Sequence, residues 1–404
     1  MKVDVQSLDT FNQLAHEGAE EATRALTQMT GIEATVDVTR ISLVDRSDIG
    51  EELGETAFVG VQFGFEGALS GETVLVFDEE RVGEIVDALM PGSTADESMA
   101  QSGVEEIGNI MMSGFIDGWA EYLDASIDHT PPTYIENEGA GVLPDGPETD
   151  ARDQIFVFRS EIKWAGEDVS FYIYMLPDYG PMAELMGEHA TTGDDAIPIE
   201  KLAVFNEMTR KGADRAAENV QMMSGIQTEA EVSQISFAPI EDIPKQFGDE
   251  TYVGTVVEFT GTPSGFLLVL FDETSAVNVA EALMPVEMDS NGLTEQHESA
   301  ITELGNIMTS GFVDGWANVL QQTVEHTPPR LVHDMGQAII DPLAAQLGRH
   351  QRHAFIIDSK MRTDELEFES EIHALPNEQE LRDALSELVV DRADQLEADA
   401  EQIF

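Results

Sequence analysis

The chain is organised around Ser102–Pro132, SGVEEIGNIMMSGFIDGWAEYLDASIDHTPP, which returns nearly intact at Ser299–Pro329 as SAITELGNIMTSGFVDGWANVLQQTVEHTPP. Plotted at 100° per residue, the apolar residues of each copy fall on one side of a helix, and the Ser, Glu and Asn residues fall on the other. Packing accounts for a repeated apolar side, but it does not require a repeated polar side. The stretch therefore predicts two helices, each with an exposed polar row that has a function.

The apolar side of each predicted helix is expected to face a core. Its positions are Val104, Ile107, Met111, Phe115, Gly118 and Tyr122 in the first copy and Ile301, Leu304, Met308, Phe312, Gly315 and Val319 in the second. Trp119 and Trp316 adjoin these positions. We therefore expect both indole rings in the core rather than on a binding surface.

The remaining sequence also repeats, with helical segments and strand segments in the same order. A predicted helix at 11–32 returns 194 residues later at 205–226. Gly31 is expected to stop the first of these helices. Segments with alternating or β-branched residues predict antiparallel strands. They lie at 34–43, 58–65, 72–77, 155–162 and 168–175, with the second hairpin of the other copy at 355–361 and 366–374. Short helices are predicted at 79–90 and 273–284.

This organisation predicts two tandem domains of the α+β class, because the repeat is too long for a solenoid. We expect the first domain at 1–186, a linker at 187–198 and the second domain at 199–377. Each domain restarts its element order at the long helix, so each is expected to consist of two related halves. Residues 378–404 predict an amphipathic helix. It either docks on its own domain, which we favour, or binds a partner.

Composition and charge restrict the function further. The chain has 404 residues, no cysteine and a net charge of −59. The charge makes nucleic acid an unexpected partner, and the lack of cysteine removes disulfides and thiolate chemistry. The most apolar run, Phe266–Phe271, is far too short to span a membrane, and a cytoplasmic location is expected. Because molar salt screens such a charge, the composition indicates a halophile.

The polar rows have a defined spacing. Ser102 is followed by Glu106, Asn109 and Pro132 at intervals that can be written S-x3-E-x2-N-x22-P. Ser299, Glu303, Asn306 and Pro329 repeat these intervals. The pattern resembles the phosphatase signature, [D/S]-x3-E-x2-N-x22-P, of the CheC/CheX/FliY family of bacterial and archaeal chemotaxis proteins. A single E-x2-N would be weak, whereas the full string at two equivalent positions is specific.

The resemblance implies a fold, an activity and roles for individual residues. Members have two pseudo-symmetric halves, each with a long helix, around an antiparallel sheet, and they hydrolyse the aspartyl phosphate of the response regulator CheY. It assigns Glu106 and Glu303 to a salt bridge with the receiver's lysine, and Asn109 and Asn306 to orienting the attacking water. No cofactor of the chain's own is expected, since the receiver brings Mg²⁺. Phosphorylated CheY is the expected partner, with the deamidase CheD as a further candidate.

The first half of each domain departs from the signature. The Glu and Asn positions hold Gln13 and His16 in the first domain and Glu207 and Arg210 in the second. Thr39 and Ser233 stand where proline is expected. Arg210 has no acceptor for a water hydrogen, and His16 lacks a neighbouring carboxylate anchor at position 13. We expect these two sites to be degenerate.

One alternative function remains. The chain could be a non-catalytic interaction protein that binds CheY, CheD or the flagellar or archaellar switch, because switch relatives share the fold without the motif.

The histidines of the two His-Thr-Pro-Pro segments, His129 and His326, have no other ligand at metal-binding spacing, so no metal site is expected.

Overall fold

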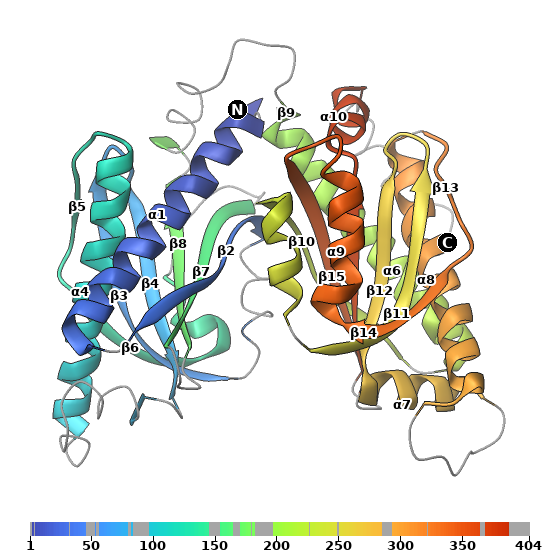
Figure 1. Cartoon of the computed structure of the whole chain (residues 1–404), viewed down its shortest axis with the longest axis horizontal. Helices are drawn as coiled ribbons and strands as arrows, with labels where there is room; N and C mark the ends of the chain where they lie inside the picture. Colours follow the sequence, from blue (N-terminus) through green and yellow to red (C-terminus); the bar gives the residue numbers. More distant parts are fainter. Residues whose placement is uncertain are drawn as a thin grey trace, which may run out of the picture. The chain divides into compact units, whose positions relative to one another are not determined.

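The computed structural model (Figure 1) describes most of the chain. The described residues are 2–3, 5–31, 33–45, 53, 56–79, 82–83, 97–144, 154–164, 170–178, 180–181, 197–225, 227–248, 250–284, 293–320, 322–363 and 368–387. Within these ranges no helix is long and apolar enough to cross a membrane. The predicted helix at 79–90 lies almost entirely outside them, as do residues 388–404 of the predicted C-terminal helix.

The chain forms two compact units. We call Val5–Thr192 the N-terminal unit, and Met1–Asp4 together with Gly193–Phe404 the C-terminal unit. The first residues belong to the C-terminal unit because β1 (Lys2–Val3) pairs with β9 (Ile197–Pro198). The boundaries thus differ from 1–186 and 187–198, because the first residues leave domain 1 and the last two linker residues form a strand.

The N-terminal unit has two long helices and seven strands among its described residues. Its helices are α1 (Val5–Thr30) and α4 (Glu97–Tyr122), with a short 3-10 turn, η2 (Gly139–Val142). Its strands are β2 (Ala34–Asp45), β3 (Ala57–Gly67), β4 (Gly71–Asp78), β5 (Ile127–His129), β6 (Thr133–Glu138), β7 (Gln154–Trp164) and β8 (Ser170–Pro177). Gly31 ends α1 as predicted: it adopts a φ of +72°, and its N–H donates to Thr27 O at 2.9 Å.

The antiparallel sheet of this unit has an internal symmetry. Its strands lie in the order β2-β7-β8-β4-β3, and β5 and β6 both pair with β3. With β6 included, the order is β2-β7-β8-β4-β3-β6. Its two halves are related by a pseudo-twofold symmetry that places β2 in the position of β6, β3 in that of β7 and β4 in that of β8. The two halves predicted for each domain therefore build one sheet together, with one long helix from each half.

The C-terminal unit repeats this plan. Its helices are α6 (Ile199–Ser224), α7 (Glu273–Leu283), α8 (Glu295–Leu320), α9 (Gly336–Leu347) and α10 (Glu378–Glu387), and its 3-10 turns are η3 (Ile240–Asp242) and η4 (Pro244–Phe247). Its main strands are β10 (Glu229–Pro239), β11 (Thr251–Thr260), β12 (Gly265–Asp272), β13 (Glu325–His326), β14 (Arg330–Met335), β15 (His353–Thr363) and β16 (Phe368–Pro376). The order β10-β15-β16-β12-β11-β14 has the same symmetry.

The short helix predicted at 273–284 is confirmed as α7, which begins at its cap Asp272. The Asp272 carboxylate accepts hydrogen bonds from the backbone N–H groups of Thr274 and Ser275. Helix α9 was not predicted, and neither were the edge strands β6 and β14. Pro342 lies inside α9 and disfavours a helix by sequence. Burial of Ile340 and Leu343 against the sheet provides the stabilisation that local sequence does not.

Each sheet carries its long helices on one face (Figure 1). In the N-terminal unit the ring of Trp119 packs edge-on against Phe65 of β3, with ring centroids 6.3 Å apart. In the C-terminal unit Trp316 does the same with Phe259 of β11 at 5.6 Å. Both tryptophans are fully buried, as predicted. The other face of the C-terminal sheet is covered by α9 and η4.

Glycines let the long helices approach each other and the sheet closely. Gly18 of α1 faces Gly118 of α4, where a Cβ on Gly118 would lie 3.0 Å from the Gly18 Cα atom. In α4, a Cβ on Gly108 would overlap the side chain of Val61 in β3. In α8, a Cβ on Gly305 would likewise overlap the side chain of Thr255 in β11. The two glycines that touch the strands each come directly before an asparagine of the polar row, so they fix the height of that row over the sheet.

The described part of the C-terminal helix docks on its own unit. Leu381 and Leu385 of α10 are fully buried. The Glu380 carboxylate accepts a hydrogen bond from the backbone N–H of Ser264 at 2.7 Å. Residues 378–387 therefore form a packed helix rather than a free peptide.

Candidate functional site

The predicted polar row lies on the accessible side of α4 and α8. Ser102 and Glu106 are exposed and Asn109 is half-buried. In α8 Ser299 and Glu303 are exposed and Asn306 is half-buried, so the two rows match in accessibility. Below them the predicted apolar positions whose side chains are described are buried, except Tyr122, which is 37% exposed. The side chain of Val319 lies outside the described residues. The prediction for Tyr122 was wrong because its hydroxyl donates to Gln13 Oε1 at 2.9 Å at the end of the helix.

The Glu and Asn side chains of both rows are available to a partner. Among the described residues, no hydrogen bond or ion pair involves the carboxylates of Glu106 and Glu303 or the carboxamides of Asn109 and Asn306. Residues three apart on a helix lie side by side. Each row therefore presents a carboxylate and a carboxamide next to each other.

The start of α8 is fixed by a reciprocal cap. Thr294 N–H donates to His297 Nδ1 at 3.2 Å, and His297 N–H donates to Thr294 Oγ1 at 3.3 Å. This arrangement corresponds to a capping box with histidine in place of glutamate. The cap lies two turns before Glu303, and the Gly305 contact with β11 lies next to Asn306. The row is thus held by the helix start on one side and by the sheet on the other.

The His-Thr-Pro-Pro segment of each unit is fixed to the strand next to the sheet edge, β3 or β11. In the N-terminal unit Thr130 N–H donates to Gly64 O at 2.8 Å, and Gly64 N–H donates to Thr130 Oγ1 at 2.8 Å. In the C-terminal unit Thr327 and Glu258 exchange the same two bonds at 2.9 and 3.0 Å. Pro132 and its counterpart at 329 are half-buried just beyond these bonds. The motif prolines therefore belong to a segment with a defined position beside the sheet.

The histidines of these segments contact a serine one turn after the asparagine of each polar row, which sequence reasoning did not predict. His129 Nε2 lies 3.1 Å from Ser113 Oγ, and Ser113 Oγ donates to Asn109 O at 2.6 Å. His326 Nε2 lies 3.1 Å from Ser310 Oγ. A signal was present in the sequence, because the serine and the histidine both recur in the repeated stretch. Their 16-residue separation hid the contact.

The degenerate positions have other surroundings. Gln13 and His16 of α1 are exposed, and His16 Nε2 lies 3.2 Å from Glu20 Oε1 one turn later. Arg210 of α6 is half-buried. The side chains of Glu207, Thr39 and Ser233 lie outside the described part of the chain.

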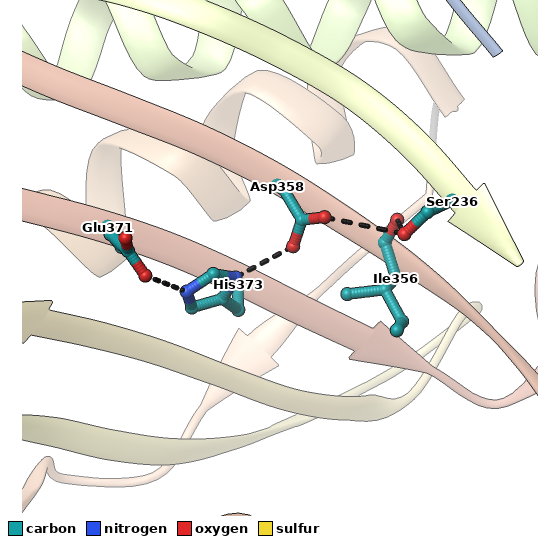
Figure 2. Close-up of polar contacts among 5 residues, drawn as sticks. All are labelled: Ser236, Ile356, Asp358, Glu371 and His373. Atoms are coloured by element: carbon teal, nitrogen blue, oxygen red, sulfur yellow. Dashed lines mark hydrogen bonds and ion pairs between the residues drawn. The ribbon is translucent and has the colours of Figure 1, made fainter. Parts of the chain in front are cut away.

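A buried ionic cluster in the C-terminal unit joins residues of β10, β15 and β16 (Figure 2). His373 Nδ1 is 2.7 Å from Asp358 Oδ1, and Nε2 is 2.9 Å from Glu371 Oε2. Ser236 Oγ donates to Asp358 Oδ2 at 3.3 Å. Burial lowers the pKa of His373, but the hydrogen bonds to Asp358 and Glu371 outweigh it and raise the pKa to about 9. Phe247 of η4 packs edge-on against the imidazole at 4.6 Å, which puts the cluster on the α9 side of the sheet.

The N-terminal unit has different chemistry at the same place in its sheet. Arg159 pairs with Tyr174 across β7 and β8, as Asp358 pairs with His373 across β15 and β16. The Arg159 guanidinium lies 5.2 Å from the ring centroid of Tyr172 and 5.9 Å from that of Tyr174. The two units therefore differ in their chemistry at this place in the sheet, whereas their polar rows match.

The described residues contain no group of three or more His, Asp or Glu side chains arranged to hold a metal ion. Within these ranges each polar row offers a carboxylate, a carboxamide and a hydroxyl group.

Comparison with known proteins identifies the family. The model of the CheC-like family matches residues 99–136 and 297–333, which contain both polar rows and both His-Thr-Pro-Pro segments. A protein of Halobacterium salinarum named "Putative CheY-P phosphatase CheC1" is 36% identical over 186 residues, covering 45% of this chain and 92% of the relative. The chain belongs to the CheC family. The relative corresponds in length to about one of the two units.

Solved structures of chemotaxis and flagellar proteins are also similar to this chain. FliY of Thermotoga maritima is 23% identical with a TM-score of 0.38, covering 47% of this chain and 98% of FliY. A CheX–CheY–BeF3–Mg²⁺ complex from Borrelia burgdorferi contains a chain that is 17% identical with a TM-score of 0.28, covering 40% of this chain and 96% of that one. The middle domain of FliM from H. pylori is 10% identical with a TM-score of 0.35, covering 46% and 99%.

Proposed function

We propose that the chain is a cytoplasmic chemotaxis phosphatase that hydrolyses the aspartyl phosphate of a CheY-type response regulator, with one working site on each unit. The observation that carries the proposal is the duplicated row of Glu106 and Asn109 on α4 and Glu303 and Asn306 on α8, accessible and without partners among the described residues. Membership of the CheC family and the name of the Halobacterium relative support the same activity.

In the proposed mechanism the asparagine holds the attacking water. A carboxamide has both an acceptor oxygen and donor hydrogens, so Asn109 or Asn306 can bind a water molecule in one orientation. Phosphoryl transfer requires mainly positioning and charge neutralisation. The water attacks phosphorus in line with the aspartyl oxygen, the bond from phosphorus to that oxygen breaks, and inorganic phosphate and the free aspartate result.

The glutamate anchors the receiver. In this role Glu106 or Glu303 forms an ion pair with the lysine of the receiver's phosphorylation site. The pair fixes the docked receiver at the position where the neighbouring asparagine reaches its phosphoryl group. Mg²⁺ is supplied by the receiver, so the chain needs to provide only the anchor and the water-binding amide.

A second candidate function is that of a non-catalytic adaptor that binds CheY, CheD or the motor switch. The degenerate residues Gln13, His16 and Arg210 show that half of the helix positions in this fold do not retain the motif. The other two positions retain both the acid and the amide with matching exposure. Docking alone would need the carboxylate but has no use for the amide in both units, so the retained pairs favour catalysis.

Binding stoichiometry tests whether both rows act. Titration of the full chain at molar KCl with a receiver activated by beryllofluoride is expected to show two receivers per chain. Glu106→Lys is expected to remove one of these sites and to leave the other unchanged, because the new cation opposes the receiver's lysine. Two unaltered sites in the variant would exclude the anchoring role of Glu106. Gln13→Lys, at the equivalent degenerate position, is the matched control and is expected to keep both sites.

A further inference from the structure

The same serine–histidine contact occurs in both units. Ser113 Oγ and His129 Nε2 are 3.1 Å apart, and so are Ser310 Oγ and His326 Nε2. Each serine is four residues after the asparagine of its row and donates to that asparagine's carbonyl oxygen, at 2.6 Å in α4 and 2.8 Å in α8. The contact therefore begins one helical turn from the proposed water-binding amide.

The contact between Ser113 and His129 can form whether the imidazole ring is neutral or protonated. His129 Nδ1 lies 3.1 Å from Thr130 O, and a carbonyl oxygen only accepts, so Nδ1 carries a hydrogen. Without a second ring hydrogen, Nε2 accepts the single hydroxyl hydrogen of Ser113, which is then not donated to Asn109 O. With one, Nε2 donates to Ser113 Oγ, which is then free to donate to Asn109 O. His326 has the same arrangement, with Nδ1 3.0 Å from Thr327 O.

The contact joins two separately anchored parts of each unit. On one side is the helix, whose height over the sheet is fixed by Gly108 and Val61. On the other is the segment that leads to Pro132, which is bonded through Thr130 to Gly64 of β3. The serine–histidine bond links these two parts directly, between the helix turn after the asparagine and the segment that leads to the motif proline.

The pair occurs only where the Glu and Asn row is present. Relative to the asparagine position, the serine lies four residues and the histidine twenty residues later. The degenerate row with His16 has Glu20 and Val36 at these positions, and the row with Arg210 has Asp214 and Ala230. A pair needed only for the fold would be expected in all four halves, because all four supply a long helix to the same pseudo-symmetric sheet. Its absence from the degenerate halves links it to the row.

We propose that Ser113 with His129, and Ser310 with His326, are positioning residues of the phosphatase sites. They hold the asparagine and the His-Thr-Pro-Pro segment as one rigid surface, so that a docked receiver meets the water-binding amide in a single geometry. This inference rests on the proposed function for its catalytic consequence. The structural cross-link itself does not depend on that function.

The test uses the full chain at molar KCl with Ser113→Ala and Ser310→Ala combined, since alanine favours the helix. Ser113→Thr with Ser310→Thr is the rescue variant, because Thr23 makes the same bond to a carbonyl four residues earlier in α1. Ser386→Ala is the matched control: its hydroxyl donates to Asp383 O at 2.7 Å in α10, a helix that carries no Glu and Asn row.

In steady-state hydrolysis of the phosphorylated receiver, the alanine variant is expected to lose about fivefold in kcat with KM changed less than twofold, the scale of one net hydrogen bond. The threonine variant should recover most of the loss, and Ser386→Ala should be unchanged. His129→Phe with His326→Phe should lower kcat as much as the alanine variant does. Combining the phenylalanine and the alanine substitutions should lower kcat no further. Unchanged kcat in the alanine variant, or additive losses, would overturn the proposal.

Hydrogen exchange separates this proposal from the proposed function. The amide of Thr130, which donates to Gly64 O, is expected to exchange about fivefold faster in the alanine variant, and that of Thr327 likewise. If the wild-type chain hydrolyses no receiver phosphate, the proposed function fails, and exchange alone decides on the cross-link. Exchange that is the same in wild type and variant would show that the cross-link does not hold the segment.

Discussion

The buried His373 cluster makes the stability of the C-terminal unit depend on pH. His373 is 9% exposed and lies between Asp358 and Glu371. Burial opposes the charged ring, but the two hydrogen-bonded carboxylates outweigh it and raise the pKa from its ordinary 6.5 to about 9. A rise of this size corresponds to about 3 kcal/mol of stability.

The sign follows from the direction of the pKa change. Below pH 6.5 the ring is protonated in both the folded and the unfolded chain, and the full stabilisation is present. As the pH rises from 6.5 towards 9, the unfolded chain loses the proton while folded His373 keeps it, so the stabilisation is progressively lost. Raising the pH from 6 to 9.5 should therefore lower the free energy of unfolding of this unit by about 3 kcal/mol from this group.

Urea unfolding at molar KCl between pH 6 and 9.5 measures this loss, with circular dichroism to follow each transition. The control carries Asp358→Asn and Glu371→Gln, which keep the side-chain shapes but remove both anions. The control should lose most of the pH dependence that the wild type shows. A wild-type chain whose unfolding midpoints do not fall above pH 7, or a control with the same fall, would refute the assignment of His373 as a buried cation.

Three further predictions concern packing, salt and docking. Gly108→Ala should lower the free energy of unfolding by about 1–3 kcal/mol because the new Cβ overlaps Val61. Gly83→Ala, where the new Cβ has no neighbour within 4 Å, is the control and should not lower it. A Gly108→Ala chain that is more stable than wild type, as helix propensity alone would make it, would contradict the close contact. The chain has a net charge of −59, and lowering KCl from about 1 M to 0.1 M lengthens the screening length from roughly 3 to 10 Å. The melting midpoint should therefore fall as the salt is lowered. A midpoint that does not move would exclude the halophile interpretation. Glu303→Lys should weaken receiver binding at the C-terminal unit alone, and equal weakening of both sites in a titration would contradict independent rows.

The repeated stretch was sufficient to predict the long helices and their buried sides, because a helix with one apolar face has a period that packing must satisfy. Trp119 and Trp316 are buried as that period requires. Tyr122 is the exception, since the last turn of α4 ends beside Gln13 and a phenol can satisfy its hydroxyl there. Periodicity gives the side of a helix, but it does not show where the opposing surface ends.

Features that depend on partners distant in sequence could not be predicted. Helix α9 contains Pro342, and only its burial against the sheet makes a helix there favourable. The His373 cluster joins strands whose register was unknown. The bond between Ser113 and His129 likewise requires the turn from α4 to β5, which spacing alone does not give. The roles of Glu106 and Asn109 are predictions from the repeated spacing and the family resemblance.

The most direct test of the account is the hydrolysis rate of a phosphorylated receiver with Asn109→Ala and Asn306→Ala combined. This variant is expected to bind the receiver but to lose the acceleration of phosphate release, because the amide holds the water and the glutamates hold the receiver. His16→Ala with Arg210→Ala is the matched control at the degenerate positions and should release phosphate at the wild-type rate. Release at the wild-type rate by the asparagine variant would contradict the mechanism, and wild-type chain without any acceleration would contradict the proposed function itself.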